Sequence, residues 1–282
     1  MIKIGEMNSL EIRGELPFAF ELSNTENDPV VLLPNVLAPK NVKVGDKVDV
    51  FVYYNDDDQL TGTPTPPKVT LNQTRKLKAV GVTDFGAFFD WGLDRDLLVL
   101  KRDQERPIAE GLEYFVHVYH DENSDRLLGS TRLHYFHPEK VDAYASLKAQ
   151  DPIEAKVYAT TDLGYKVMIN DHYLGLMFFS DSLRKMRVGE SFSGFVKPIR
   201  SDGKIDVTTH IDNRKSRASL EQTILDDLEA HGGISSITDK SPPDEIFAHF
   251  KVSKGAYKKA IGTLYKQKRI EISKTSIKLV EK

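Results

Sequence analysis

The feature that most constrains the fold of this chain is a threefold internal repeat. Three segments align, namely GDKVDVFVYYNDDDQLTGT from Gly45, GLEYFVHVYHDENSDRLLGST from Gly111 and GESFSGFVKPIRSDGKIDVTT from Gly189. Each begins with a glycine turn and an alternating strand, then continues through a polar loop into a second short strand, which is typical of a β-hairpin. The starts lie 66 and 78 residues apart. The repeat therefore predicts three small domains in a row.

A second shared pattern lies upstream of each hairpin. It reads LEIRGELPFAFELSNTENDPVVLLP at 10–34, KAVGVTDFGAFFDWGLDRDLLVL at 78–100 and AKVYATTDLGYKVMINDHYLGLMFF at 155–179. Each pattern supplies three strands before the two of the hairpin, and five strands in a unit of this size match an OB barrel. The strand count alone also fits other small barrels, such as an SH3-like one.

The middle copy adds a more specific signal. Its V-x-D-F-G-A-F-x-D segment, residues 82–90, closely resembles the S1 motif of RNA-binding OB folds. The resemblance implies that Phe85 and Phe88 project from a binding face and that a charged hairpin position falls on Arg126. A third stacking position of the motif falls on Val99, which has no ring to stack.

The other two copies depart from this pattern. In the third copy Leu163 and Lys166 replace the two phenylalanines, while Phe178 fills the third position and Tyr165 adds an aromatic ring. The first copy is the weakest match. It keeps two rings but lies in an acidic segment, and its three candidate positions are Phe18, Phe20 and Leu32.

Aromatic rings suit this function because every unpaired base has a π face that a ring can cover, for ~1–3 kcal/mol per base. Phe85 and Phe88 are three residues apart, so on a regular strand they would point in opposite directions. A bulge at Gly86 would bring both to one face; the alternative is that one ring belongs to the core. Trp91 is either a stacking residue or an inter-barrel packing residue, and we favour packing.

The pattern changes to a helical period after residue 213. Residues 213–219, NRKSRAS, are predicted to be a polar basic linker and flexible joint. Ser219 is the expected N-cap of the first helix, and Ser241 and Ser253 are the expected N-caps of two more. The segment ISKTSIKLV follows as a strand of a wing. Three helices and a wing are the order of a winged helix, a variant of the helix-turn-helix.

The third predicted helix separates its side chains by charge. At 100° per residue its apolar residues occupy one arc and its cations another. A cationic arc on a helix is often a solvated face, but an arc without an intervening acid favours phosphate contact. Charge is also uneven along the chain, because residues 1–66 carry 5 Lys and Arg against 11 Asp and Glu, whereas the last 32 residues carry 10 against 2. The cationic arc consists of Lys254, Lys258, Lys259, Lys266 and Arg269.

Three S1-like units followed by a winged helix, in this order and length, resemble the conserved virulence factor B family of Gram-positive bacteria. The resemblance covers nearly the whole chain, and VTDFGAFFDWGLDRDLLVL and PPDEIFAHFKVSKGAYKKAIGTLYK carry it most specifically. It implies RNA binding shared between the barrels and the winged helix, and a role in controlling the expression of secreted virulence factors.

The predicted fold class is a multidomain, mainly β chain with three tandem five-stranded OB/S1-like barrels and an α+β winged-helix domain at the C-terminal end. The expected domains are barrel 1 at 1–66, barrel 2 at 67–145, barrel 3 at 146–212 and the winged helix at 213–282. We found no GxxxxGK[ST], GxSxG or HExxH motif and predict no enzyme activity, no cofactor and no metal site.

The predicted function is binding of single-stranded RNA in post-transcriptional regulation. The alternatives are a winged-helix DNA-binding transcription regulator and a ribosome- or ribonuclease-associated adaptor that contacts a protein through barrel 1. The chain has no cysteine, no apolar leader segment and no run near the ~20 residues of a membrane helix, so we expect a cytoplasmic protein without membrane contact.

Overall fold

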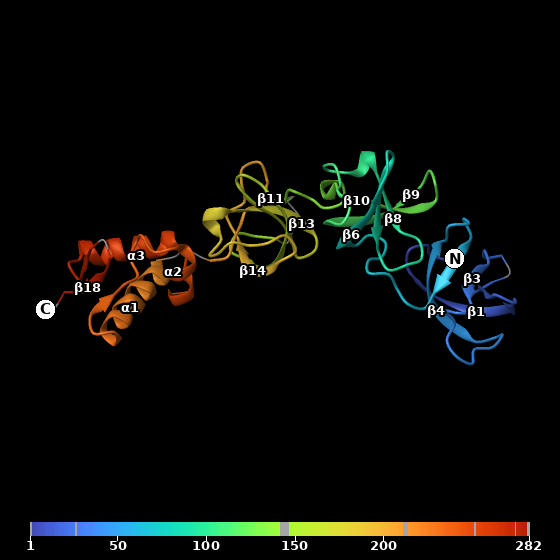
Figure 1. Cartoon of the computed structure of the whole chain (residues 1–282), viewed down its shortest axis with the longest axis horizontal. Coiled ribbons are helices and arrows are strands. Elements are labelled where there is room, and N and C mark those ends of the chain that lie inside the picture. The colour runs from blue at the N-terminus through green and yellow to red at the C-terminus, as the bar shows by residue number, and fades with distance from the viewer. Residues whose placement is uncertain are drawn as a thin grey trace. The chain divides into compact units, whose positions relative to one another are not determined.

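The computed structural model describes residues 2–25, 27–141, 147–210, 214–250, 252–273 and 275–280, with the backbone alone for residues 214–219. The chain forms two compact units, Met1–Phe136 and His137–Lys282. The first unit contains two β-barrels, and the second contains a third barrel and a helical domain (Figure 1).

Barrel 1 is a closed barrel with the strand order β1-β2-β3-β5-β4, which is the order of an OB fold. Alternate side chains of these strands point inward, so that Leu10, Ile12 and Leu22 are completely buried. Its strands are β1 Met7–Glu15, β2 Ala19–Ser23, β3 Val31–Pro34, β4 Lys47–Tyr54 and β5 Leu60–Thr63.

Barrels 2 and 3 repeat this arrangement as five-stranded sheets of orders β10-β9-β6-β7-β8 and β13-β12-β11-β14-β15. A 3-10 turn follows β8, β10 and β13 at Lys101–Asp103, Leu133–Tyr135 and Phe179–Asp181. The strands are β6 Thr74–Val82, β7 Gly86–Asp90, β8 Leu97–Leu100, β9 Glu113–Asp121, β10 Arg126–Ser130, β11 Pro152–Thr160, β12 Gly164–Ile169, β13 Tyr173–Phe178, β14 Ser191–Val196 and β15 Val207–Thr208. The predicted fold class of three tandem OB-like barrels is confirmed.

The first strand of every barrel carries the same irregularity. Its pairing with the second strand shifts between Ile12 and Gly14, between Ala79 and Gly81, and between Val157 and Ala159. A bulge bends its strand and increases the local twist, which lets one long strand pair with two neighbours around a barrel. The three bulges put equivalent residues of the three barrels in register.

Barrels 1 and 2 share one hydrophobic cluster, which we call the seam. Phe51 and Tyr53 of β4 pack with Trp91, which lies between β7 and β8, and the Phe51 and Trp91 rings meet edge to face at 6.1 Å. Trp91 is only 3% exposed, and its Nε1–H donates to the Arg95 carbonyl at 2.5 Å. Trp91 is therefore an inter-barrel packing residue, the alternative that we favoured.

The helical domain begins earlier than its sequence pattern predicts. Helix α1 spans Arg214–Ala230, so residues 214–219 are helical and the predicted linker is wrong; residue 213 lies outside the described residues. The segment contains neither Gly nor Pro, and Arg, Lys and Ala are good helix formers, so the helix continues through residues whose polarity resembles that of a linker. Ser219 consequently lies inside the helix and is not its N-cap.

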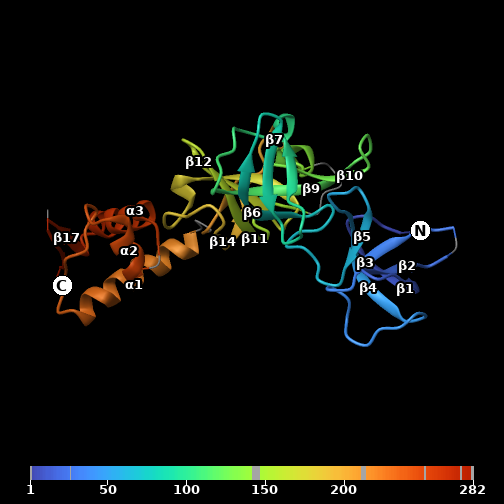
Figure 2. The same ribbon diagram turned by 45° about the vertical axis from the view of Figure 1, so that its right-hand side comes forward.

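The remaining elements match a winged helix. Helices α2 Pro243–Phe250 and α3 Lys254–Lys266 follow α1, and Figure 2 shows α1 alongside both of them. The Ser253 hydroxyl accepts from the Ala256 N–H at 3.2 Å, as expected of an N-cap. The wing is a three-stranded sheet of order β16-β18-β17. Its strands are β16 Ile234–Ser235, β17 Ile270–Ile272 and β18 Ile277–Leu279.

A buried histidine makes the stability of the second unit depend on pH. His137 lies against barrel 3, where its Nδ1 contacts the His172 carbonyl at 3.0 Å. Burial lowers the pKa of His137 below its ordinary value, although the hydrogen bond to His172 acts in the opposite direction. The unfolded chain therefore binds more protons at this residue than the folded chain does, once the pH falls below the ordinary histidine pKa of about 6.5.

We predict that acidification from about pH 7 to about pH 5 lowers the melting temperature of the second unit, and that His137→Gln reduces this loss. Glutamine retains an N–H donor but does not titrate. The measurement is differential scanning calorimetry of the full chain and the variant at both pH values. Equal losses in the two proteins would show that His137 does not contribute.

Within the described residues, no helix is both long and apolar enough to cross a membrane. Over the same ranges, no group of three or more His, Asp or Glu side chains is arranged to hold a metal ion.

Candidate nucleic-acid interface

Phe85 and Phe88 form an aromatic pair on the outside of barrel 2. Phe85 precedes β7 and is 56% exposed, Phe88 is half-buried on β7, and their rings meet edge to face at 5.8 Å. The predicted bulge at Gly86 is wrong, because Gly86 pairs regularly with Leu100 and the irregularity lies on β6. Phe85 shares a face with Phe88 because it lies in the turn, where the alternation of a strand does not apply. The ring in the core is Phe89.

The third stacking position of barrel 2 also differs from the prediction. Val99 is completely buried, and the outward residues of β8 are Leu98 and Leu100. Gly86 pairs with Leu100 in barrel 2 as Gly164 pairs with Phe178 in barrel 3, so Leu100 is the counterpart of Phe178. The predicted position was wrong by one residue, and one residue reverses the face of a strand.

The face of barrel 3 is built from different side chains. Leu163, in the turn before β12, is 65% exposed, and Lys166 and Phe178 are half-buried. Sequence analysis missed Lys197, whose ammonium lies 5.6 Å from the centre of the Phe178 ring and 2.8 Å from Asp181 Oδ2. A cation close to a ring suits a nucleotide, because a base can stack where a phosphate can pair.

Tyr165 cannot act as a surface aromatic. It is buried in the barrel 3 core, where its hydroxyl accepts from the Met186 N–H at 3.0 Å, so its assignment to the binding face is wrong. It directly precedes Lys166, and strand alternation turns it inward. The exposed aromatic that sequence analysis missed is Phe179, which meets the Tyr165 ring edge to face at 5.0 Å.

Barrel 1 carries a carboxylate where barrel 2 carries a ring. The strand pairings Gly14–Glu21, Gly81–Phe88 and Ala159–Lys166 are equivalent across the three bulges. Phe20, which the sequence pattern assigned to this position, is instead buried in the barrel 1 core. The same place on the three barrels therefore presents Glu21, Phe88 and Lys166, an anion, a ring and a cation.

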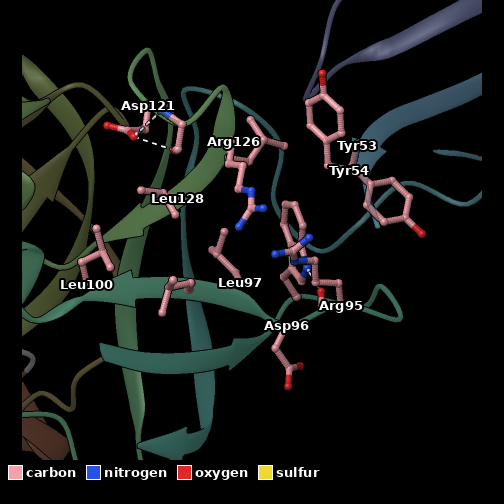
Figure 3. A pocket seen from close by; sticks show the side chains of 13 residues that line it. Tyr53, Tyr54, Arg95, Asp96, Leu97, Leu100, Asp121, Arg126 and Leu128 are labelled. Atoms are coloured by element: carbon pink, nitrogen blue, oxygen red, sulfur yellow. Dashed lines mark hydrogen bonds between the residues drawn. The ribbon is translucent and has the colours of Figure 1, made fainter. Parts of the chain in front are cut away.

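Arg126 lies at the edge of a cavity beside the seam. The cavity measures about 250 Å³. Figure 3 shows Arg126 above Leu97 and Arg95 beside Leu97, on the side where Tyr53 and Tyr54 of barrel 1 lie. Asp58 Oδ1 of barrel 1 accepts from Arg126 Nη2 at 2.5 Å. The predicted phosphate ligand Arg126 thus already has an anionic partner, and Arg95 is a second arginine that sequence analysis missed.

Helix α3 separates its residues as the helical wheel predicts. Tyr257, Ala260, Ile261 and Leu264 are buried against the rest of the domain. Four of the five predicted cations are exposed and Lys254 is half-buried. The four lysines of the predicted arc therefore lie on the side of α3 opposite the core, and Lys258, Lys259 and Lys266 are exposed. Arg269 is also exposed but lies beyond the end of α3, so its predicted place on the helix is wrong.

Three S1-like barrels and a winged helix define a class of multidomain protein built from nucleic-acid-binding domains. Residues 4–65 match the S1 domain family, and residues 222–279 match the family described as the CvfB-like winged helix domain. Both are nucleic-acid-binding domain types. The S1 match falls on barrel 1, the copy with the weakest S1 pattern by our sequence criteria. Those criteria weighed only the exposed rings, whereas barrel 1 shares its strand order and bulge with the other two barrels.

The predicted resemblance to the conserved virulence factor B family is confirmed by similarity over the full chain. The chain is 26% identical to Conserved virulence factor B of Staphylococcus saprophyticus, across 99% of this chain and 95% of the relative. It is 24% identical to the uncharacterized protein YitL of Bacillus subtilis, across 94% and 90% of the two chains. A crystal structure of a multidomain protein with nucleic acid binding domains from Streptococcus pneumoniae aligns with 24% identity, a TM-score of 0.44 and 98% coverage of both chains.

Proposed function

We propose that this protein binds single-stranded RNA and acts as a non-enzymatic, cytoplasmic, post-transcriptional regulator. The observation that carries the proposal is the aromatic pair on the outside of barrel 2, formed by the exposed Phe85 and the half-buried Phe88. Two rings on one face cover two unpaired bases, whereas the bases of a duplex are stacked on one another and have no free face. The staphylococcal relatives are named as virulence factors, and we propose that the genes regulated by this protein include virulence factors.

The division of labour follows from the side chains at equivalent positions. Barrel 2 supplies stacking rings, and barrel 3 supplies Lys166 and the Phe178–Lys197 pair for mixed contacts to base and phosphate. Barrel 1 places Glu21 at the corresponding position, which disfavours a polyanion. We propose the four domains at 1–66, 67–145, 146–212 and 213–282, where the end of the second range, from His137 to Val141, packs on barrel 3. We propose barrel 1 as a module that does not stack RNA bases.

The test is direct binding of the full chain to three ligands of matched sequence at one fixed salt concentration, because affinities at different salt cannot be compared. The ligands are single-stranded RNA, single-stranded DNA and duplex DNA. We expect the single strands to bind more tightly than the duplex, and RNA to bind most tightly. Preference for the duplex would instead support a transcription regulator acting through the winged helix. Absence of binding to all three would support a protein-binding adaptor.

We further predict that α3 contributes affinity and not sequence preference. Lysine meets phosphates well but reads base edges poorly, and each phosphate contact on a single strand contributes about 0.7 to the slope of log affinity against log salt. Replacing Lys254, Lys258 and Lys259 by alanine is therefore expected to flatten the slope by up to about two units. Two unrelated RNA sequences should lose affinity by similar factors.

The control for this prediction removes the same charge from barrel 1, at the exposed residues Lys40, Lys43 and Lys47. A similar change in slope in both triple variants would show that net charge, not the α3 surface, is responsible. A loss confined to one RNA sequence would show that α3 reads bases.

A further inference from the structure

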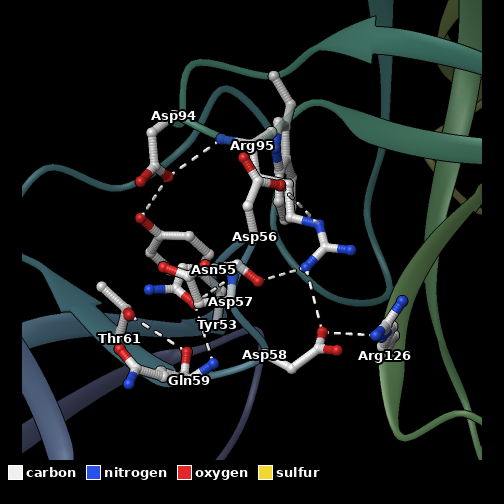
Figure 4. Close-up of polar contacts among 11 residues, drawn as sticks. Tyr53, Asn55, Asp56, Asp57, Asp58, Gln59, Thr61, Asp94, Arg95 and Arg126 are labelled. Carbon is white, nitrogen blue, oxygen red and sulfur yellow. Dashed lines mark hydrogen bonds and ion pairs between the residues drawn. The ribbon is translucent and has the colours of Figure 1, made fainter.

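The loop between β4 and β5 of barrel 1, residues 55–59, reaches two arginines of barrel 2. We call it the acidic loop. Asp58 Oδ1 lies 2.5 Å from Arg126 Nη2 and 3.6 Å from Arg95 Nη1, and Asp56 Oδ1 lies 3.6 Å from Arg95 Nε. Arg95 also donates to the Asn55 carbonyl. Figure 4 shows Asp58 between the two guanidinium groups, with contacts to both.

The acidic loop is held in a defined conformation. The Asn55 side chain accepts from the Asp57 and Gln59 N–H groups at 3.0 and 2.9 Å. The strand that leads into the acidic loop is held at the seam, where the Tyr53 hydroxyl donates to Asp94 Oδ1 at 2.6 Å. Because the seam is a buried hydrophobic contact, the carboxylates are delivered to the arginines by the folding of the unit and not by chance contact of mobile side chains.

The two arginines belong to the same surface as the aromatic pair. Phe88 of β7 pairs with Leu98 of β8, and Leu98 and Leu100 line the cavity together with Arg95 and Arg126. A nucleic-acid strand stacked on Phe85 and Phe88 would reach the two guanidinium groups by crossing β8. Arginine pairs with carboxylate and phosphate through the same donor geometry, so the carboxylates of the acidic loop occupy the contacts that phosphates would make.

We propose that barrel 1 regulates the RNA-binding face of barrel 2, with the acidic loop as an internal substitute for RNA phosphates at Arg95 and Arg126. The inference rests on the proposed function. Asp56 and Asp58 are mostly exposed, and ion pairs of this kind contribute little to stability, so phosphates can displace them without unfolding the seam. In the free protein the loop screens the arginines, and binding to this half of the face requires its displacement.

The test is a mutant cycle in the full chain, read as affinity for one single-stranded RNA at several salt concentrations. The double asparagine variant, Asp56→Asn with Asp58→Asn, is expected to tighten binding about three- to tenfold and to steepen the salt dependence by about one unit, as the arginines become available to phosphate. Arg126→Ala alone is expected to change little, because Asp58 already neutralises Arg126. When Arg126→Ala is added to the double asparagine variant, it should remove most of the gain.

Two controls test whether a gain in RNA affinity comes from the acidic loop itself. Glu15→Gln with Asp49→Asn removes two exposed carboxylates of barrel 1 outside the acidic loop and should not reproduce the gain. The fluorescence of Trp91, the only tryptophan, should be unchanged in every variant if the seam stays docked.

Each other outcome overturns the inference. Weaker binding by the double asparagine variant would mean that the carboxylates position the arginines for RNA, and unchanged binding would mean that the contact is purely structural. The result for Phe85→Ala distinguishes the two proposals. If that variant loses affinity while the double asparagine variant gains none, only the regulatory inference fails; if no variant binds RNA, the proposed function fails.

Discussion

Replacing Trp91 by alanine is expected to lower the free energy of unfolding of the first unit by about 3–5 kcal/mol, the usual cost of removing a buried large aromatic side chain. Trp91 is 3% exposed and packs in one cluster with Phe51 and Tyr53 of barrel 1. The substitution leaves a cavity between two barrels and removes the hydrogen bond to the Arg95 carbonyl. Both barrels contribute to the cluster, so both should lose stability together.

Denaturant unfolding followed by circular dichroism measures the effect, because the variant lacks the only tryptophan and hence its fluorescence. Trp91→Phe keeps most of the side-chain volume and should lower the free energy of unfolding by less than Trp91→Ala does. Phe18→Ala, which removes a ring that is 65% exposed on barrel 1, should change stability by no more than about 0.5 kcal/mol. If Trp91→Ala lowers the free energy of unfolding by no more than Phe18→Ala does, the seam is not a cooperative core.

The second large effect concerns binding. Phe85→Ala is expected to weaken binding to single-stranded RNA by ~1–3 kcal/mol, the value of one base stacked on one ring. Phe85 is largely exposed and lies in a turn, so its removal should leave the fold intact. The loss therefore reports on stacking and not on stability. Affinity is measured at one salt concentration, with a thermal melt of the variant as the check on folding.

Two further rings serve as comparisons for Phe85. Phe178→Ala in barrel 3 should cause a smaller loss, because Leu163 stands there in place of the first ring. Phe18→Ala in barrel 1 should cause almost none, because the neighbouring outward position holds Glu21. Normal folding with unchanged affinity of Phe85→Ala would show that the ring does not contact a base, whereas equal losses in all three barrels would show that barrel 1 also binds RNA.

The acidic loop accounts for part of the excess of acidic residues in barrel 1. The acidic residues of barrel 1 could have indicated a protein-binding module, but two of them are used within the molecule, against Arg95 and Arg126. If this face binds RNA as proposed, an internal anion on it favours ligands that bring several phosphates, since a single phosphate contact only replaces a carboxylate contact.

Several elements were determined by local sequence. The threefold hairpin pattern predicted three five-stranded barrels, because strand alternation and turn residues act over a few positions. The N-cap at Ser253 and the separation of buried and cationic faces on α3 also depend only on near neighbours along one helix. The motif also predicted that Phe85 and Phe88 share one outer face, although the predicted bulge at Gly86 is not the reason.

Other features were decided by the tertiary structure, because they depend on pairings that a linear pattern cannot express. Alternation along regularly paired strands places Val99 and Tyr165 in the cores and turns their neighbours Leu98 and Lys166 outward, so an assignment that is wrong by one residue selects the wrong face. The bulges in β1 and β6 place Glu21, and not Phe20, at the position of Phe88. The partner of Arg126 is Asp58, 68 residues earlier in the chain. Only the docking of barrel 1 onto barrel 2 brings that carboxylate to the arginine, and this docking depends on the fit of Trp91 against Phe51.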